Sequence, residues 1–305
     1  MINICSPNQA RLPTALALGS FDGLHAGHRK VINEITTVSS AIPTLVSFWP
    51  HPREVLYKES RLRLDLPSEK TSLLEGLGIQ QFVLVPFDNS LAALSAEEFF
   101  NKILLGVLKA RKIAVGQNFR FGKNREGDPF LMKEFALKNN VEIAIVPILE
   151  DKCGRVSSSR IRFSLSEGDL KTARNLLGRP YNFRGIVRKG KGLGLKIGWP
   201  TANLEVNGRK FLPGIGVYAA WAEINNEKER FPAVMNLGPQ PTIDPKAPSA
   251  VEVHLLDKKV ELNNKELIIE PIKRIRGQKK FQDLKSLSKQ IGLDADLARS
   301  IINEL

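Results

Sequence analysis

Cysteine is scarce in this sequence of 305 residues: only Cys5 and Cys153 are present, and no Cys-x-x-Cys spacing occurs. This scarcity excludes a disulfide-stabilised scaffold and a cysteine-rich zinc site, and it is typical of a reducing cytosol. The N-terminal segment has neither the basic region nor the long apolar region of a signal peptide. No apolar run approaches the ~20 residues that a membrane-spanning helix needs. We therefore expect a soluble, cytoplasmic protein with no membrane partner.

Acidic residues are fewer than basic residues in this sequence. The chain has 45 lysines and arginines against 32 aspartates and glutamates, which gives a formal net charge of +13. This excess favours an anionic partner, and nucleic acid, an acidic membrane surface and phosphorylated small molecules all qualify. The length of the chain indicates two domains, each long enough to bury its own core.

In the first 180 residues, short apolar runs alternate with helical patterns. The apolar runs, which we expect to be strands, are residues 14–21, 43–50, 79–87, 110–119 and 141–149. The helical patterns between them include residues 28–40, 95–110 and 128–140. This alternation predicts a Rossmann-like α/β domain, with a parallel sheet and helices on both faces.

The pattern changes near residue 180. A helix over 168–181, with Asp169 as its N-cap and Gly178 at its end, precedes the change. Strands without intervening helices follow at 181–190, 216–225, 230–238, 249–257 and 265–275. They predict a small antiparallel β-domain, a barrel or a sandwich. The tail over 283–305 predicts two short helices broken near Gly292. We therefore expect domains over residues 1–180 and 181–305.

Two of the four histidines, His25 and His28, lie three residues apart directly after the first expected strand. Parallel sheets bind ligands at this edge, and the N-terminus of a helix there suits phosphate. Gly23 and Gly27 allow a phosphate to approach the backbone. Two imidazoles on one helix face could donate hydrogen bonds to a phosphate as charge develops on it. A turn capped by histidines is the simpler alternative, and a zinc site is disfavoured because no third ligand has suitable spacing.

Further stretches of the first domain contain groups that suit nucleotides, and each of them also has a simpler structural interpretation. Residues 115–128 hold glycines, phenylalanines and basic side chains, which suit a flat ring and its phosphate but also a mobile loop. Residues 155–162 cluster hydroxyls and arginines, which suit a triphosphate but also a helix N-cap. His51, between two prolines, could touch a nucleotide or cap a turn.

The second domain carries two comparable stretches. Residues 188–205 interleave glycines with lysines, as a polyphosphate-binding loop or a glycine-rich hairpin would. Thr201 and Asn203 are two residues apart, so in an extended segment both face the same way and could supply oxygen ligands for magnesium. On the strand at 251–257, Glu252 faces away from Val251 and Val253. It could accept a proton from a substrate hydroxyl or simply face solvent.

The motifs of the first domain, taken in order, resemble those of one family. They are "GSFDGLHAGH", "SFWPHP", "VGQNFRFGKNREGD", "VSSSRIR" and "LLGRPY". Together they resemble the HxGH nucleotidyltransferase domain of the bacterial bifunctional riboflavin kinase/FMN adenylyltransferases, also called FAD synthetases. The resemblance implies catalytic roles for His25, His28 and Arg162. It implies nucleotide contacts at Gly19, Phe21, Gly27, Ser158 and Ser159, and flavin contacts at Asn118, Phe119, Arg120 and Phe121.

The second domain resembles the riboflavin kinase module of the same family, a small β-barrel with a helical tail. The matching segments are the glycine-rich loop with "PTAN", "GVYA", "NLGPQPTI" and Glu-x-His. The resemblance implies nucleotide contacts at Gly190, Gly192 and Gly194. It also implies that Thr201 and Asn203 bind Mg²⁺ and that Glu252 is the base.

The activity implied is ATP-dependent phosphorylation of riboflavin to FMN, followed by adenylylation of FMN to FAD with release of pyrophosphate. The partners implied are riboflavin, FMN and ATP, without nucleic acid, and the oligomeric state is left open. Three residues depart from the family pattern: Trp199 replaces Phe, Ser159 replaces Thr and Gln240 replaces Arg. Gln240 motivates one alternative, an adenylyltransferase with a degenerate kinase module. The basic segment 273–280 motivates another, an RNA-binding protein.

Overall fold

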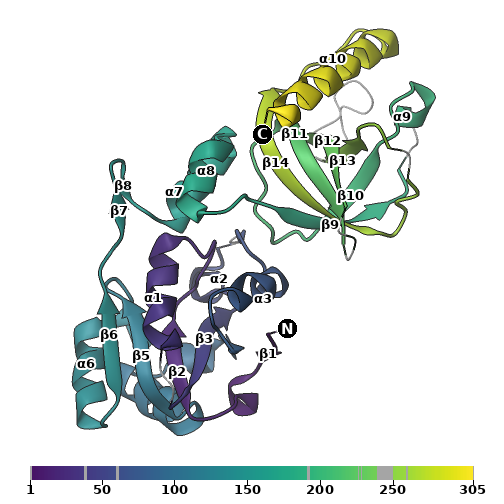
Figure 1. The fold of residues 1–305 in the computed structure, drawn as a ribbon. Coiled ribbons are helices and arrows are strands. Elements are labelled where there is room, and N and C mark those ends of the chain that lie inside the picture. The colour runs from purple at the N-terminus through teal and green to yellow at the C-terminus, as the bar shows by residue number, and fades with distance from the viewer. Residues whose placement is uncertain are drawn as a thin grey trace. The chain divides into compact units, whose positions relative to one another are not determined.

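The computed structural model describes residues 2–37, 40–59, 62–190, 193–225, 227, 229–238, 250–258 and 260–304 (Figure 1). It divides into two compact units, Met1–Ser158 and Ser159–Leu305. The domain boundary that the sequence pattern places near residue 180 stays a prediction.

The first unit contains a six-stranded sheet in which every pairing is parallel. Its strand order is β1-β4-β3-β2-β5-β6. The bounds are β1 Ile4–Cys5, β2 Thr14–Leu18, β3 Ile42–Trp49, β4 Gln81–Pro86, β5 Ala110–Gly116 and β6 Glu142–Val146. The apolar runs therefore form the expected parallel sheet.

Helices cover both faces of this sheet, because alternate strand residues point to opposite sides. One core joins Ala15 and Ala17 to α1 (Ala26–Thr36) and α3 (Pro67–Glu75). The other joins Leu16 and Leu18 to the π-helix η2 (Phe99–Val107) and α6 (Pro129–Lys138). The remaining short elements are η1 Pro7–Gln9, α2 Pro52–Tyr57, α4 Asn89–Ala92, α5 Ala96–Glu98, η3 Lys123–Arg125, β7 Glu150–Asp151 and β8 Gly154–Arg155.

The strand order defines where this sheet binds ligands. From β2 the chain moves to β3 and β4 on one side, and then crosses to β5 and β6 on the other. The order reverses between β2 and β5, and such a reversal opens a crevice at the carboxyl ends of parallel strands. The segments that follow these two strands, residues 19–25 and 117–128, contain the histidine turn and the expected flavin loop.

The second unit begins with two helices, α7 (Ser158–Glu167) and α8 (Leu170–Leu177). Asp169 caps α8 by accepting from the Thr172 N–H, and Gly178 ends it in the left-handed conformation, as expected. Six antiparallel strands then close into a barrel in the order β10-β13-β12-β11-β14-β9. They are β9 Phe183–Arg188, β10 Ala202–Val206, β11 Gly216–Ile224, β12 Arg230–Gly238, β13 Ala250–Leu255 and β14 Glu266–Arg276. The short α9 spans Leu193–Lys196.

The tail corrects one expectation. Residues Leu284–Asn303 form a single helix, α10, that continues through Gly292. A Cβ at Gly292 would lie 3.3 Å from the Trp199 ring. This glycine therefore allows close packing of α10 on the barrel, and the expected break is wrong. Ala295 and Ala298 pack on the outer face of β11 and β12, against Val217, Ala219 and Val234.

Candidate active sites

The histidine turn joins the carboxyl end of β2 to the N-terminus of α1. His25 is the N-cap of α1, and its Nδ1 accepts from the His28 N–H at 3.4 Å. The two imidazoles are stacked with ring centroids 3.7 Å apart. Because His25 Nδ1 accepts, Nε2 of His25 carries the proton and can donate. The buried Nδ1 of His28 has no hydrogen-bond partner among the described residues.

Both imidazoles are neutral at pH 7. Burial, assisted by the positive charges of Arg155 and Arg29, lowers the pKa of His25 to about 4. Burial also holds the pKa of His28 well below its usual value, assisted by His25, Lys70 and Arg155. The pair therefore acts as neutral donors beside fixed positive charge, which suits a polyanionic ligand.

The other nucleotide-binding candidates of this unit lie around the turn. A Cβ at Gly27 would lie 3.3 Å from the His25 ring, so the glycine leaves room for that imidazole. Ser158 Oγ donates to the Asp22 carbonyl at 2.7 Å. Gly19 follows β2 directly, and its N–H donates to Val46 O. Phe21 is buried in the core with its ring edge against His28, so its side chain supports the histidine.

Sequence reasoning missed a buried polar cluster behind the turn. Lys70 on α3 is only 3% exposed, and its Nζ donates to the Ser20 carbonyl at 3.0 Å. Burial lowers its pKa to about 8, even though Asp22, Asp65 and Glu69 oppose that shift. The Asp22 carboxylate accepts from the main-chain N–H groups of residues 64 and 65. No local signal identified Lys70, because a lysine in a helical segment normally faces solvent.

The expected flavin loop follows β5 and divides into packed and open parts. Phe121 is buried against Phe99, and the Phe119 ring is stacked on it at 5.9 Å between centroids. Asn118 and Arg120 are exposed. The packed phenylalanines hold the loop, and the two exposed polar side chains remain available to a ligand.

Two further candidates belong to the second unit. Arg162 on α7 lies with its guanidinium over the Phe211 ring, and Ser159 lies in the first turn of the same helix. Their roles stay predictions from the motif.

His51, in the first unit, caps α2 by accepting from the Arg53 N–H.

The barrel brings the second set of candidates together on adjacent strands. Asn203 on β10 is paired with Glu252 on β13, and Glu252 is paired with Asn236 on β12. Because paired residues point to the same face of a sheet, the three side chains form one row. Glu252 and His254 alternate with buried Val251 and Val253, as expected. Asn236 lies two residues from Val234, which packs beneath α10, so the row lies on the outer face of the barrel.

Two glycines of the 188–205 stretch lie close to the expected metal ligands. A Cβ at Gly190 would lie 2.0 Å from Asn203 Nδ2, and a Cβ at Gly194 would lie 3.0 Å from Thr201 Oγ1. The loop can approach these side chains only because both positions are glycine. Gly192 and Gln240 lie outside the described residues, so their expected roles stay predictions.

Glu252 has the environment of a base. Burial raises the pKa of its carboxyl, which makes it a better proton acceptor than an exposed glutamate. Asn236 Nδ2 donates to Glu252 Oε2 at 3.2 Å and opposes that shift. His254 Nδ1 lies 2.6 Å from the Pro200 carbonyl, next to Thr201. His254 thus links the strand of Glu252 to the segment that carries the expected metal ligands.

Comparison with known families matches each part of the chain separately. The family model for FAD synthetase matches residues 8–160, and that for riboflavin kinase matches residues 177–302. A parallel-sheet nucleotidyltransferase domain followed by a riboflavin kinase barrel defines a class of bifunctional transferases. Within this class, the chain belongs to the bifunctional riboflavin kinase/FMN adenylyltransferase family. It therefore phosphorylates riboflavin to FMN with ATP and adenylylates FMN to FAD.

Individual relatives agree over nearly the whole chain. The bifunctional riboflavin kinase/FMN adenylyltransferase of Bacillus subtilis (strain 168) is 36% identical, covering 92% of this chain and 90% of the relative. Its counterpart in Escherichia coli (strain K12) is 34% identical, covering 93% of this chain and 91% of the relative. The crystal structure of a Streptococcus pneumoniae protein named macrolide-efflux protein superposes with a TM-score of 0.83 at 28% identity, covering 98% of both chains.

Hydropathy adds one further finding. Among the described residues, no helix combines the length and the apolar character that crossing a bilayer requires.

Proposed function

We propose that the two reactions of this enzyme take place at two separate sites, the histidine turn and the outer row of the barrel. The observation that carries the proposal is the grouping of Glu252, Asn203 and Asn236 on paired strands, far in sequence from the stacked His25 and His28. Each group has the chemistry of one reaction and lacks that of the other.

At the histidine turn, a phosphate oxygen of FMN attacks the α-phosphorus of ATP. The new P–O bond forms as the bond from the α-phosphorus to the bridging oxygen breaks, and pyrophosphate leaves. Because FMN is already ionised, no strong base is required. His25 and His28 donate hydrogen bonds to the developing negative charge. The unpartnered Nδ1 of His28 supports this role, since a buried polar atom needs a partner. The family motif implies a catalytic role for Arg162 as well.

At the barrel, the terminal ribityl hydroxyl of riboflavin attacks the γ-phosphorus of ATP, and ADP leaves. Glu252 accepts the hydroxyl proton, which its raised pKa favours. Gly190 and Gly194 let the loop backbone lie close to the phosphates. Holding the reactants in line supplies most of the catalysis in such transfers.

We assign the divalent metal of the kinase reaction to Thr201 and Asn203 and infer that it is Mg²⁺. Both side chains lie beneath the glycine-rich loop and offer neutral oxygen atoms. Neutral oxygens fit a hard cation that is also held by phosphates and water. When bound there, the ion neutralises charge on the phosphates. The two free cysteines, Cys5 and Cys153, support the proposal that the enzyme acts in the cytoplasm.

Single substitutions test the two-site proposal. We expect His28→Ala to abolish FAD formation from FMN and to leave FMN formation from riboflavin intact. We expect Glu252→Ala to do the reverse. A lost transition-state donor costs roughly 100-fold or more in rate. Chromatography of riboflavin, FMN and FAD measures both steps in one reaction. Equal loss of both steps in a folded variant would show that the reactions share one site.

A further inference from the structure

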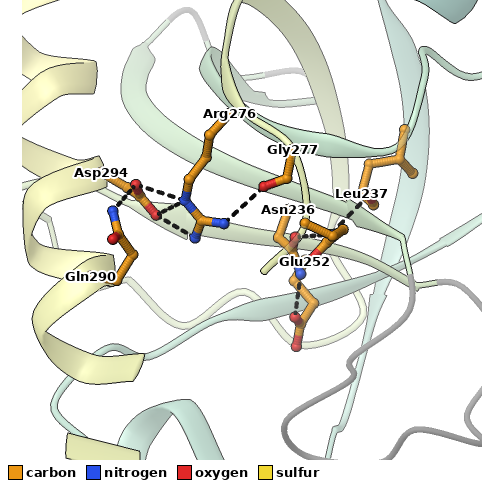
Figure 2. A network of polar contacts seen from close by, with 8 residues as sticks. Asn236, Leu237, Glu252, Arg276, Gly277, Gln290 and Asp294 are labelled. Atoms are coloured by element: carbon orange, nitrogen blue, oxygen red, sulfur yellow. Dashed lines mark hydrogen bonds and ion pairs between the residues drawn. The ribbon is translucent and has the colours of Figure 1, made fainter. Parts of the chain in front are cut away.

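A chain of hydrogen bonds runs from Glu252 to a residue that the proposed mechanism does not use. Asn236 Nδ2 donates to Glu252 Oε2 at 3.2 Å (Figure 2). Gln278 Nε2 donates to Asn236 Oδ1 at 2.7 Å and to the Leu237 carbonyl at 3.2 Å. Gln278 belongs to the basic segment 273–280, which the sequence offered as a candidate RNA-binding element.

The direction of these bonds follows from the chemistry of the groups. The Leu237 carbonyl can only accept, so Gln278 must present its NH₂ group there. The same NH₂ group meets Asn236, which must therefore present Oδ1 to Gln278. That leaves the Asn236 NH₂ group facing the Glu252 carboxylate, where it is attractive. The reversed Asn236 amide would place two acceptors against each other. Gln278 therefore selects the amide orientation that holds the carboxylate.

Gln278 is itself fixed by its neighbours. Arg276, at the end of β14, donates from Nη2 to Asp294 Oδ2 at 2.7 Å and from Nε to Oδ1 at 3.0 Å (Figure 2). Its side chain is 14% exposed and that of Asp294 only 4%. Gln290 donates to the same carboxylate. These bonds secure α10 to the chain two residues before Gln278.

The space for Gln278 also depends on a glycine. Gly238 has a φ of +138°, and a Cβ there would lie 3.1 Å from Gln278 Nε2 and 2.6 Å from the Ile215 side chain. The end of β12 therefore leaves room for the Gln278 amide.

Two arginines of the basic segment 273–280 have a structural role in the second unit. Arg274 donates to the Ile215 carbonyl, and Arg276 binds Asp294. Both guanidinium groups are thus engaged inside the second unit.

We propose that Gln278 is a positioning residue for riboflavin phosphorylation. Through Asn236, it holds the Glu252 carboxylate in the orientation that meets the substrate hydroxyl. The inference rests on the proposed role of Glu252 as the base. It adds a residue that acts without touching substrate, because Gln278 contacts Asn236 and the backbone of β12 rather than the carboxylate.

The test uses Gln278→Met, which keeps the shape of the side chain and removes its donors. We expect kcat for FMN formation to fall on the order of tenfold, as for one lost hydrogen bond to a polar partner. We expect KM for riboflavin and for ATP to stay within about twofold, because binding contacts are untouched. FAD formation from FMN should be unchanged. Lys279→Leu, at the exposed neighbouring position, is the matched control and should leave both rates unchanged.

A double-mutant cycle separates positioning from a merely structural role. If Gln278 acts through Asn236, adding Gln278→Met to Asn236→Ala should produce no further loss of kcat. Losses that multiply, or a rise in KM with kcat unchanged, would overturn the inference. The unfolding transition of the barrel unit, measured by calorimetry, reports that the barrel of each variant still folds. Gln278→Ala replaces the methionine variant should that one fail to fold.

Glu252→Ala distinguishes the inference from the function on which it rests. If Glu252→Ala leaves FMN formation intact, the assignment of the base is wrong. If Glu252→Ala abolishes FMN formation while Gln278→Met does not change it, only the positioning role of Gln278 is wrong.

Discussion

At the residue scale, His25 caps a helix and still keeps one ring nitrogen that the cap does not use. The Nδ1 of His25 caps α1, while its Nε2 stays available as a donor. The capping interpretation of the turn is therefore confirmed, and donation to a phosphate stays a proposal. The neutral state of the pair is set by burial and by nearby cations, among them Lys70, which is far away in the sequence.

This burial predicts acid sensitivity of the first unit. In the unfolded chain, His25 takes up a proton as pH falls through about 6.5, whereas in the folded chain its pKa is about 4. The unfolded state therefore binds more protons in this window, so stability present above pH 6.5 is lost as pH falls towards 4. The loss from His25 amounts to up to about 3 kcal/mol.

The variant His25→Asn tests this prediction, because asparagine keeps a capping acceptor but does not titrate. We expect the free energy of unfolding of the variant to fall less than that of the parent protein between pH 7 and pH 4.5. Urea denaturation at the two pH values measures the difference. An identical fall in both proteins would contradict the prediction.

At the scale of elements, glycines at positions 190 and 194 allow the backbone to approach the expected metal ligands closely. The loop approaches Thr201 and Asn203 more closely than a side chain at positions 190 or 194 would permit. Alternation of polar and apolar residues along β13 similarly places Glu252 in the row with Asn203 and Asn236. Local conformation sets which face these groups take, and strand pairing brings them together.

The variant Gly190→Ala should displace Asn203, because the added Cβ would lie 2.0 Å from Asn203 Nδ2. We expect FMN formation to fall by roughly a hundredfold, the typical cost of a small misplacement in an active site. FAD formation from supplied FMN should be unchanged. Gly208→Ala is the control, since a Cβ there meets nothing within 4 Å. Normal FMN formation by Gly190→Ala would argue against close approach of the loop.

At the scale of the whole molecule, the two units have separate cores. The parallel sheet buries two apolar layers, and the barrel carries α10 on its outer face. Since each unit has its own core, each can unfold as its own cooperative transition. The buried pair of Arg276 and Asp294 belongs to the barrel unit alone.

The variant Asp294→Asn should therefore destabilise only the barrel unit. Removing one partner leaves the Arg276 charge buried, at a cost of about 3 kcal/mol. We expect calorimetry to show one transition at a lower temperature and the other unchanged, with FMN formation lost on heating before FAD formation. Asp296→Asn, on the same helix but 77% exposed, should shift neither transition measurably. A shift of both transitions by Asp294→Asn would show that the units unfold together.

The sequence by itself determined most of the elements and the family. The apolar periodicity of β2, β5 and β13, the cap at Asp169 and the ordered motifs all depend on residues a few positions apart, so they can be read locally. The tertiary structure decided which distant groups meet. Lys70 reaches the Ser20 carbonyl, and Gln278 reaches Asn236, because sheet packing and barrel closure bring them together. Gly292 continues a helix rather than ending it, because Trp199 packs there. Such contacts depend on chain segments that no local pattern specifies.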